Sequence, residues 1–156
     1  MAGGRSPAAE AHFVGWLGSG CRMRVRRFAL ACSVLFVAAI VWNGLVHLVL
    51  LRRADAVVRH LYRPDLADRT WALLSVTAGV VVLFAWGYSR FARVGSIREG
   101  MGYGVFFALL AGVLVDLNPY VLFPIPGRLA AAWFLGGIVE FVVYGIILSR
   151  FHPLAG

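Results

Sequence analysis

Four long apolar stretches dominate the chain, and short connections between them carry most of its charge. The first two stretches contain no charged residue, and the last two contain one acidic residue each. A helix of about 20 apolar residues spans the ~30 Å hydrocarbon core of a bilayer. The pattern therefore predicts an all-α polytopic membrane protein, a bundle of four transmembrane helices. The predicted spans are residues 28–51, 71–89, 101–117 and 129–149.

The first connection, residues 52–70, has an amphipathic pattern. Its apolar residues recur at helical spacing, and arginines fill the opposite face. Two interpretations remain open: an amphipathic helix on the membrane surface that ends at Pro64, or a plain continuation of the first transmembrane helix. The apolar positions are Ala54, Val57, Val58, Leu61 and Tyr62.

The third connection is apolar but rich in proline. The prolines predict that the helix breaks at two motifs, Asn118-Pro119 and Pro124-Ile125-Pro126, although the residues between these motifs are apolar. A non-helical segment cannot face lipid, because its backbone groups would lack hydrogen-bond partners. We expect this segment at the interface or folded against the bundle.

Composition and charge support the membrane assignment. Charged residues are 14% of the chain, whereas a soluble domain carries about 25%. The formal charge is +8, and all fifteen basic residues are Arg. Because these arginines flank the apolar stretches, they predict contacts with anionic lipid headgroups and not with nucleic acid. The use of Arg without any Lys suggests a high-GC bacterial genome, and hence a bacterial inner-membrane protein. With nine arginines on one side and six on the other, the bias predicts that both termini are cytoplasmic.

The N-terminal residues differ from the rest of the chain. Residues 1–22 are rich in Ala, Gly, Ser and Pro, which predicts a disordered tail, and Met23 is an alternative start. Residues 23–156 would then form one transmembrane domain. The two cysteines, Cys21 and Cys32, form no C-x-x-C motif, so neither a disulfide nor a thiolate metal site is predicted.

A few polar residues fall inside the predicted spans and form the candidate site. Glu140 lies 11 residues after Leu129, which places it near the middle of the bilayer. A carboxylate there costs about 3 kcal/mol on insertion scales, so it must face protein or water, or be protonated. The predicted cluster consists of Asn43, His47, Asp116, Glu140 and Tyr144.

Small residues predict where the helices approach closely. They recur every four residues along two helices, in line with Asp116 on one and with Glu140 on the other. This small-xxx-small spacing allows membrane helices to pack at short distance. The predicted packing residues are Gly104, Ala108, Gly112, Ala132 and Gly136.

Two roles for Glu140 remain open. It is either a proton or cation site, or a neutral carboxyl group that joins helices by hydrogen bonds to Asn43 or Tyr144. We predict no bound metal or cofactor, since His47, Asp116 and Glu140 lie at different depths. We also predict no enzymatic activity, because no nucleophile–base pair is visible.

Several local motifs occur together: Trp71, Gly102-Tyr-Gly, Asn118-Pro, Pro124-Ile-Pro, and the block from Ala132-Trp-Phe-Leu-Gly-Gly to Glu140. On these motifs, residues 23–150 resemble a group of small four-helix bacterial membrane proteins of unknown function. The resemblance implies the four-helix architecture. The sequence thus predicts a non-enzymatic membrane protein, an accessory or packing component that forms homo-oligomers or joins a membrane complex. The alternative is a proton-coupled carrier or channel formed by an oligomer around Glu140.

Overall fold

The computed structural model describes residues 25–151, which form helices joined by short connections and contain no β-strand. Four helical segments are each long and apolar enough to cross a membrane: Val25–Leu50, Ala67–Phe91, Ile97–Leu122 and Gly127–Phe151. They match the four predicted spans, and the fold class is confirmed. The predicted tail, Met23 and Cys21 lie outside the described residues.

The first and third spans change helical type near one end. The regular helices are α2 (Val25–Asn43), α3 (Arg52–Val58), α4 (Thr70–Phe91), α5 (Ile97–Gly112), α6 (Asn118–Leu122) and α7 (Gly127–Phe151). Wider π-helical segments follow α2 and α5: η1 (Gly44–Leu50) and η4 (Val113–Leu117). Short 3₁₀ turns, η2 (Arg59–Leu61) and η3 (Ala67–Arg69), lie between α3 and α4.

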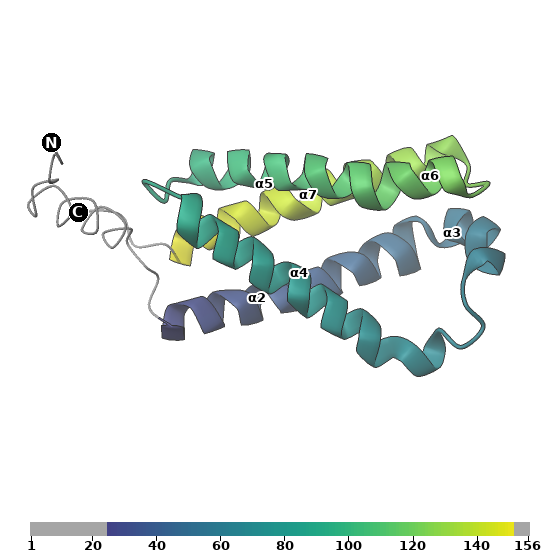
Figure 1. Cartoon of the computed structure of the whole chain (residues 1–156), viewed down its shortest axis with the longest axis horizontal. Helices are drawn as coiled ribbons and strands as arrows, with labels where there is room; N and C mark the ends of the chain where they lie inside the picture. Colours follow the sequence, from purple (N-terminus) through teal and green to yellow (C-terminus); the bar gives the residue numbers. More distant parts are fainter. Residues whose placement is uncertain (1–24, 152–156) are drawn as a thin grey trace, which may run out of the picture.

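Helices α5 and α7 run side by side along their lengths, and α2 and α4 cross on their other side (Figure 1). Glycines allow the α5–α7 backbones to approach closely. A Cβ atom on Gly104 would collide with the backbone of Phe141, and one on Gly100 would collide with the carbonyl oxygen of Gly145. Direct backbone contact of this kind is how small residues hold membrane helices together.

Aromatic packing joins three helices around one ring. Phe84 on α4 is fully buried, and its ring centroid lies 4.9 Å from Tyr103, 5.0 Å from Phe107 and 5.5 Å from Phe141. Tilted and edge-on ring pairs are favourable beyond the area that they bury. The main core lies at this end of the bundle, where α2 contributes Ala31, Leu35 and Ala39.

Helix α3 is a separate short helix and not a continuation of the first span, because Leu51 leaves helical geometry (φ −103°, ψ 7°). Part of its apolar face packs on protein: Val58 is 1% exposed and clusters with Ile125, Leu129 and Ala130, whereas Val57 is 57% exposed. The helical turns end at Leu61, before the proline. The connection therefore forms a separate helix that ends before Pro64, as the surface-helix interpretation predicts. Its buried side packs against the start of α7.

The predicted helix break at Asn118-Pro119 was wrong. The helix continues through both residues as α6 and ends at Leu122, and Phe123 is extended. Proline normally removes a backbone hydrogen bond and clashes with the preceding turn. Here the preceding turn is the wider η4, and a widened turn accommodates this disruption.

The turn between α4 and α5 is held by one side chain. Glu99 accepts hydrogen bonds from the backbone N–H groups of Arg93, Val94 and Gly95, at 2.6, 3.0 and 2.7 Å. In return, Ser96 Oγ caps α5 by accepting from the Glu99 N–H. The spacing Ser-x-x-Glu is the sequence signature of such a cap. Gly95 has φ 71°, a conformation that glycine adopts without strain.

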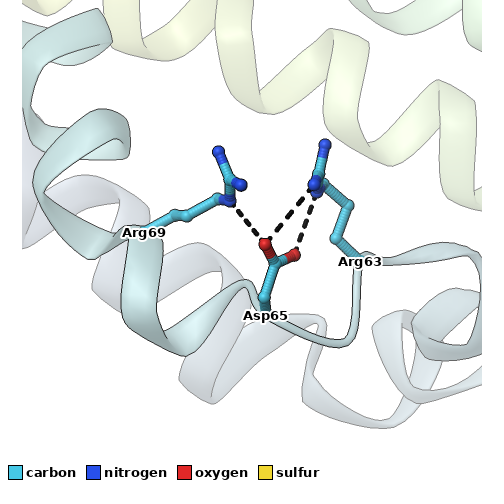
Figure 2. A network of polar contacts seen from close by, with 3 residues as sticks. All are labelled: Arg63, Asp65 and Arg69. Carbon is cyan, nitrogen blue, oxygen red and sulfur yellow. Dashed lines mark hydrogen bonds and ion pairs between the residues drawn. The ribbon is translucent and has the colours of Figure 1, made fainter.

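The connection before α4 is fixed by two ion pairs (Figure 2). Asp65 accepts from Arg63 Nε at 3.0 Å and from Arg69 Nε at 2.6 Å. The hydrogen bonds from Arg63 and Arg69 lower the pKa of this exposed carboxyl group.

Candidate functional site

A cavity of about 760 Å³ lies in the half of the bundle near α3 and α6. Its walls come from every transmembrane segment and are mostly apolar. The five predicted polar residues all line it: Asn43, His47, Asp116, Glu140 and Tyr144. The fold thus brings together side chains that lie up to 101 positions apart, between Asn43 and Tyr144.

Glu140 is held on one oxygen only. Asn43 Nδ2 donates to Glu140 Oε1 at 3.0 Å, and the Tyr144 hydroxyl donates to the same oxygen. Asn43 also donates to the carbonyl of Ala39 at 2.9 Å, which fixes its amide on α2. Within residues 25–151, no hydrogen bond reaches Glu140 Oε2. Glu140 lines the cavity, and its second oxygen has no hydrogen-bond donor within these residues.

Asp116 faces the same cavity with less support. It makes no hydrogen bond or ion pair with any residue between 25 and 151. Its Oδ2 lies 3.6 Å from where a Cβ of Gly112 would be and 3.9 Å from where one of Gly137 would be. Two glycines thus leave room for this carboxyl group between η4 and α7.

His47 joins the cavity to the end of the bundle where α3 lies. Its Nδ1 lies 2.8 Å from Asp55 Oδ2, and Trp133 Nε1 donates to Asp55 Oδ1 at 3.0 Å. The Asp55 side chain is only 13% exposed. With Nδ1 bound to the carboxylate, the opposite ring nitrogen, Nε2, is the one that Asp55 does not engage.

Asp55 and Trp133 were not predicted as members of the site, because Asp55 lies in the arginine-rich first connection, outside the predicted spans. One signal was present: a tryptophan packed inside a bundle requires an acceptor for its indole N–H. The structure supplies that acceptor from α3, and the same carboxylate orients His47.

Both π-helical segments coincide with the site. His47 lies in η1 and Asp116 lies in η4. Such wide turns are rare, and they occur frequently at functional sites because they shift the direction of side chains. No pattern in the sequence had indicated them.

The charges in the cavity are unbalanced. Its lining carries two acidic side chains, Asp116 and Glu140, and one histidine, His47, among the described residues. Among the described residues that line the cavity there is no Arg. None of the arginines between residues 25 and 151 therefore compensates these two acidic side chains within the cavity.

The two predicted rows of small residues, which we call the α5 ridge (Gly104, Ala108 and Gly112) and the α7 ridge (Ala132 and Gly136), do not pack against each other. Gly104, Ala108 and Gly112 are buried in α5, but they contact the face of α7 that carries Phe134 and Phe141. Gly136 lies on the other face of α7, where a Cβ would approach only Val46 Cγ1, at 4.0 Å. Ala132 is also only partly buried. The α7 ridge therefore faces the end of the first span and not α5.

No group of three or more His, Cys, Asp or Glu residues that could hold a metal ion occurs in the described part of the chain. Comparison with protein-family models, curated proteins and solved structures gives no match. The case for a function therefore depends on the cavity and the residues that line it.

Proposed function

We propose that the protein is a small, non-enzymatic integral membrane protein whose cavity binds a ligand in exchange for a proton at Glu140. It would be a proton-linked binding protein or carrier. One observation supports this most strongly. Glu140 and Asp116 both line a cavity of about 760 Å³, and the two hydrogen bonds that hold Glu140 engage only Oε1.

The geometry favours this function over a purely structural role. The hydrogen bond from Asn43 to Glu140 would suffice to join α2 with α7, and it requires no open space. The Asp116 carboxyl group, which makes no hydrogen bond within residues 25–151, costs free energy in the membrane and joins no helices. Ionisable groups inside a membrane usually mark binding sites or proton pathways.

Asp55 and His47 supply a route for the proton. They lie at the end of the bundle near α3, whereas Glu140 lies deeper, beside Tyr144 in the main core. Asp55 contacts His47, and His47 lines the same cavity as Asp116 and Glu140. In this proposal protons reach Glu140 from the α3 side.

We place this protein in a bacterial inner membrane with both termini in the cytoplasm, in keeping with its resemblance to small four-helix bacterial membrane proteins. The α3 side would then face the periplasm. Arginines at the ends of the spans would contact anionic headgroups. Reporter fusions after Arg53, Arg93, Gly127 and Gly156 test the topology, and a periplasmic signal at Gly156 would overturn it.

Self-association as an accessory component is the second candidate. Gly79 on α4 meets nothing within 4 Å, and the exposed Ser75 lies one turn before it. A small-residue face of this kind allows another membrane helix to approach. The mass of the purified protein in detergent tests this role. The cavity itself is formed within a single chain, so ligand binding does not require a second copy.

Infrared difference spectroscopy tests the proposed function directly. The wild-type protein should show a carboxyl band that is lost on raising the pH and is missing in Glu140→Gln. Proton uptake by liposomes that contain the wild type should exceed uptake with the variant. A Glu140 carboxyl group that stays protonated up to about pH 9, with no uptake, would refute the proposal.

A further inference from the structure

The cavity also indicates what it binds. We infer that its ligand is a lipophilic organic cation, with an apolar body and one positive charge. The inference rests on the proposed function, because it identifies the ligand that would exchange with the proton. It is supported by the charge of the cavity wall, by the size of the cavity and by its opening.

Charge excludes the other simple ligands. An anion would face Asp116 and Glu140 with no Arg among the described residues of the wall. A neutral apolar molecule, such as an acyl chain, would leave Asp116 against hydrocarbon, which is costly. A cation would give Asp116 and Glu140 Oε2 the partner that residues 25–151 do not provide.

The remaining wall fits an apolar body. A volume of about 760 Å³ lies within the range of small-molecule pockets. Aromatic side chains contribute to the lining on the α2 and α7 sides, including Trp42, Trp133 and Phe141. Aromatic rings also attract cations through their negative faces. The combination of rings and carboxyl groups matches a bulky cation better than a hydrated metal ion.

The opening of the cavity faces the bilayer. Lining residues at its rim are strongly exposed: Val76 on α4 is 66% exposed, and Leu114 and Val115 in η4 are 61% and 65% exposed. Here α4 diverges from the α5–α6 segment (Figure 1). The exposed rim is apolar, so a ligand would enter sideways from the hydrocarbon. Only a cation that partitions into lipid can take this route.

Binding would compete with protonation. When the cation binds, the Glu140 carboxyl group releases its proton to water and the carboxylate pairs with the ligand. The titratable groups facing Glu140 are Tyr144 on α7, His47 in η1 and Asp116 in η4. The residues of α4 that line the cavity, among them Thr77, carry no titratable group. Affinity should therefore fall as the pH falls.

The test uses the full chain in phosphatidylcholine nanodiscs, with empty nanodiscs as background. The probes are tetraphenylphosphonium, a permanent cation, and two compounds of similar shape: neutral triphenylphosphine oxide and anionic tetraphenylborate. Equilibrium binding is measured at pH 6 and pH 8 for the wild type and the variants Asp116→Asn, Glu140→Gln and the double variant. Asp65→Asn is the matched control, since it removes a carboxylate outside the cavity.

We expect saturable binding of tetraphenylphosphonium by the wild type and Asp65→Asn, with affinity at least fivefold higher at pH 8. Each cavity variant should bind at least tenfold more weakly, and the double variant should not bind. Circular dichroism and gel filtration confirm that the variants fold; a Gln at 140 can still accept from Asn43 and Tyr144. Equal binding of the neutral compound, stronger binding of the anion, or unchanged affinity in the double variant would overturn the inference.

The two proposals can fail separately. If Glu140 titrates in the infrared experiment but tetraphenylphosphonium does not bind, the cation inference is wrong and the proton site stands. If tetraphenylphosphonium binds at the carboxyl groups with no pH dependence and no proton release, the proton-linked function is wrong.

Discussion

Asn43 on α2 donates a hydrogen bond to Glu140 on α7, with 3.0 Å between Nδ2 and Oε1. The two residues are 97 positions apart, and their bond ties the first transmembrane helix to the last. It also determines which oxygen of Glu140 remains available. The same contact is therefore both structural and, in our proposal, functional.

Loss of this bond should weaken the bundle measurably. We predict that Asn43→Leu lowers the free energy of unfolding by about 1 kcal/mol, which is the usual scale of hydrogen bonds between membrane helices. Val41→Leu is the control, because Val41 is 65% exposed on the same helix. Unfolding in mixed micelles measures both variants. Equal stability would show that the bond contributes nothing.

Two glycines on α5 provide a matched pair for the packing of α5 against α7. A Cβ at Gly104 would overlap the backbone of Phe141, whereas a Cβ at Gly102 meets nothing within 4 Å. Gly104→Ala should cost roughly 1–3 kcal/mol, as overpacking does, because a backbone cannot move aside easily. Gly102→Ala should be neutral. Thermal denaturation in detergent distinguishes them, and two equal melting temperatures would contradict the close approach.

Gly136 and Gly145 test which face of α7 packs against α5. The nearest atom to a Cβ at Gly136 is Val46 Cγ1 at 4.0 Å, an ordinary contact, so Gly136→Ala should be tolerated within about 0.5 kcal/mol. Gly145→Ala should destabilise the bundle, because its Cβ would collide with the carbonyl group of Gly100. Greater damage from Gly136→Ala would favour the ridge predicted from spacing alone.

Substitution of Asp55 should switch the tautomer of His47. The Asp55 carboxylate accepts a hydrogen bond from His47 Nδ1–H. An asparagine at this position can still accept from Trp133 through its side-chain oxygen, but its NH₂ group would donate to Nδ1. In Asp55→Asn the ring proton should therefore move from Nδ1 to Nε2. Nitrogen NMR of labelled histidine reads the tautomer, with His60 as the internal control. An unchanged His47 signal would show that Asp55 does not orient the ring.

The Arg63–Asp65–Arg69 cluster should make the free energy of unfolding depend on pH in the acidic range. The two arginines lower the pKa of folded Asp65 below its value in the unfolded chain. Their contribution is therefore complete above the unfolded pKa and is lost as the pH falls through the folded pKa. The wild type should be more stable than Asp65→Asn at pH 6, and the difference should shrink towards pH 2. A stability difference that grows as the pH falls would contradict a lowered pKa of Asp65 in the folded protein.

Local sequence determined the four spans, because hydrophobicity is a property of each segment and a bilayer selects segments by length. It also placed Glu140 one helical turn from Tyr144, and Asn43 one turn from His47, since a helix repeats its faces every three to four residues. The five polar residues of the predicted cluster could be identified individually, because each is a polar side chain inside an apolar segment. These conclusions require no knowledge of how the helices meet.

Only the tertiary structure decided which faces meet. The α5 glycines could have packed on either face of α7, and the choice depends on shape complementarity between residues far apart in the chain. Pro119 continues a helix because the wide η4 turn precedes it. Asp55 reaches His47 and Trp133 because α3 folds onto α7. The cavity is the space left where α4 diverges from α5, and no single segment encodes it, because empty volume is a property of how all the helices pack.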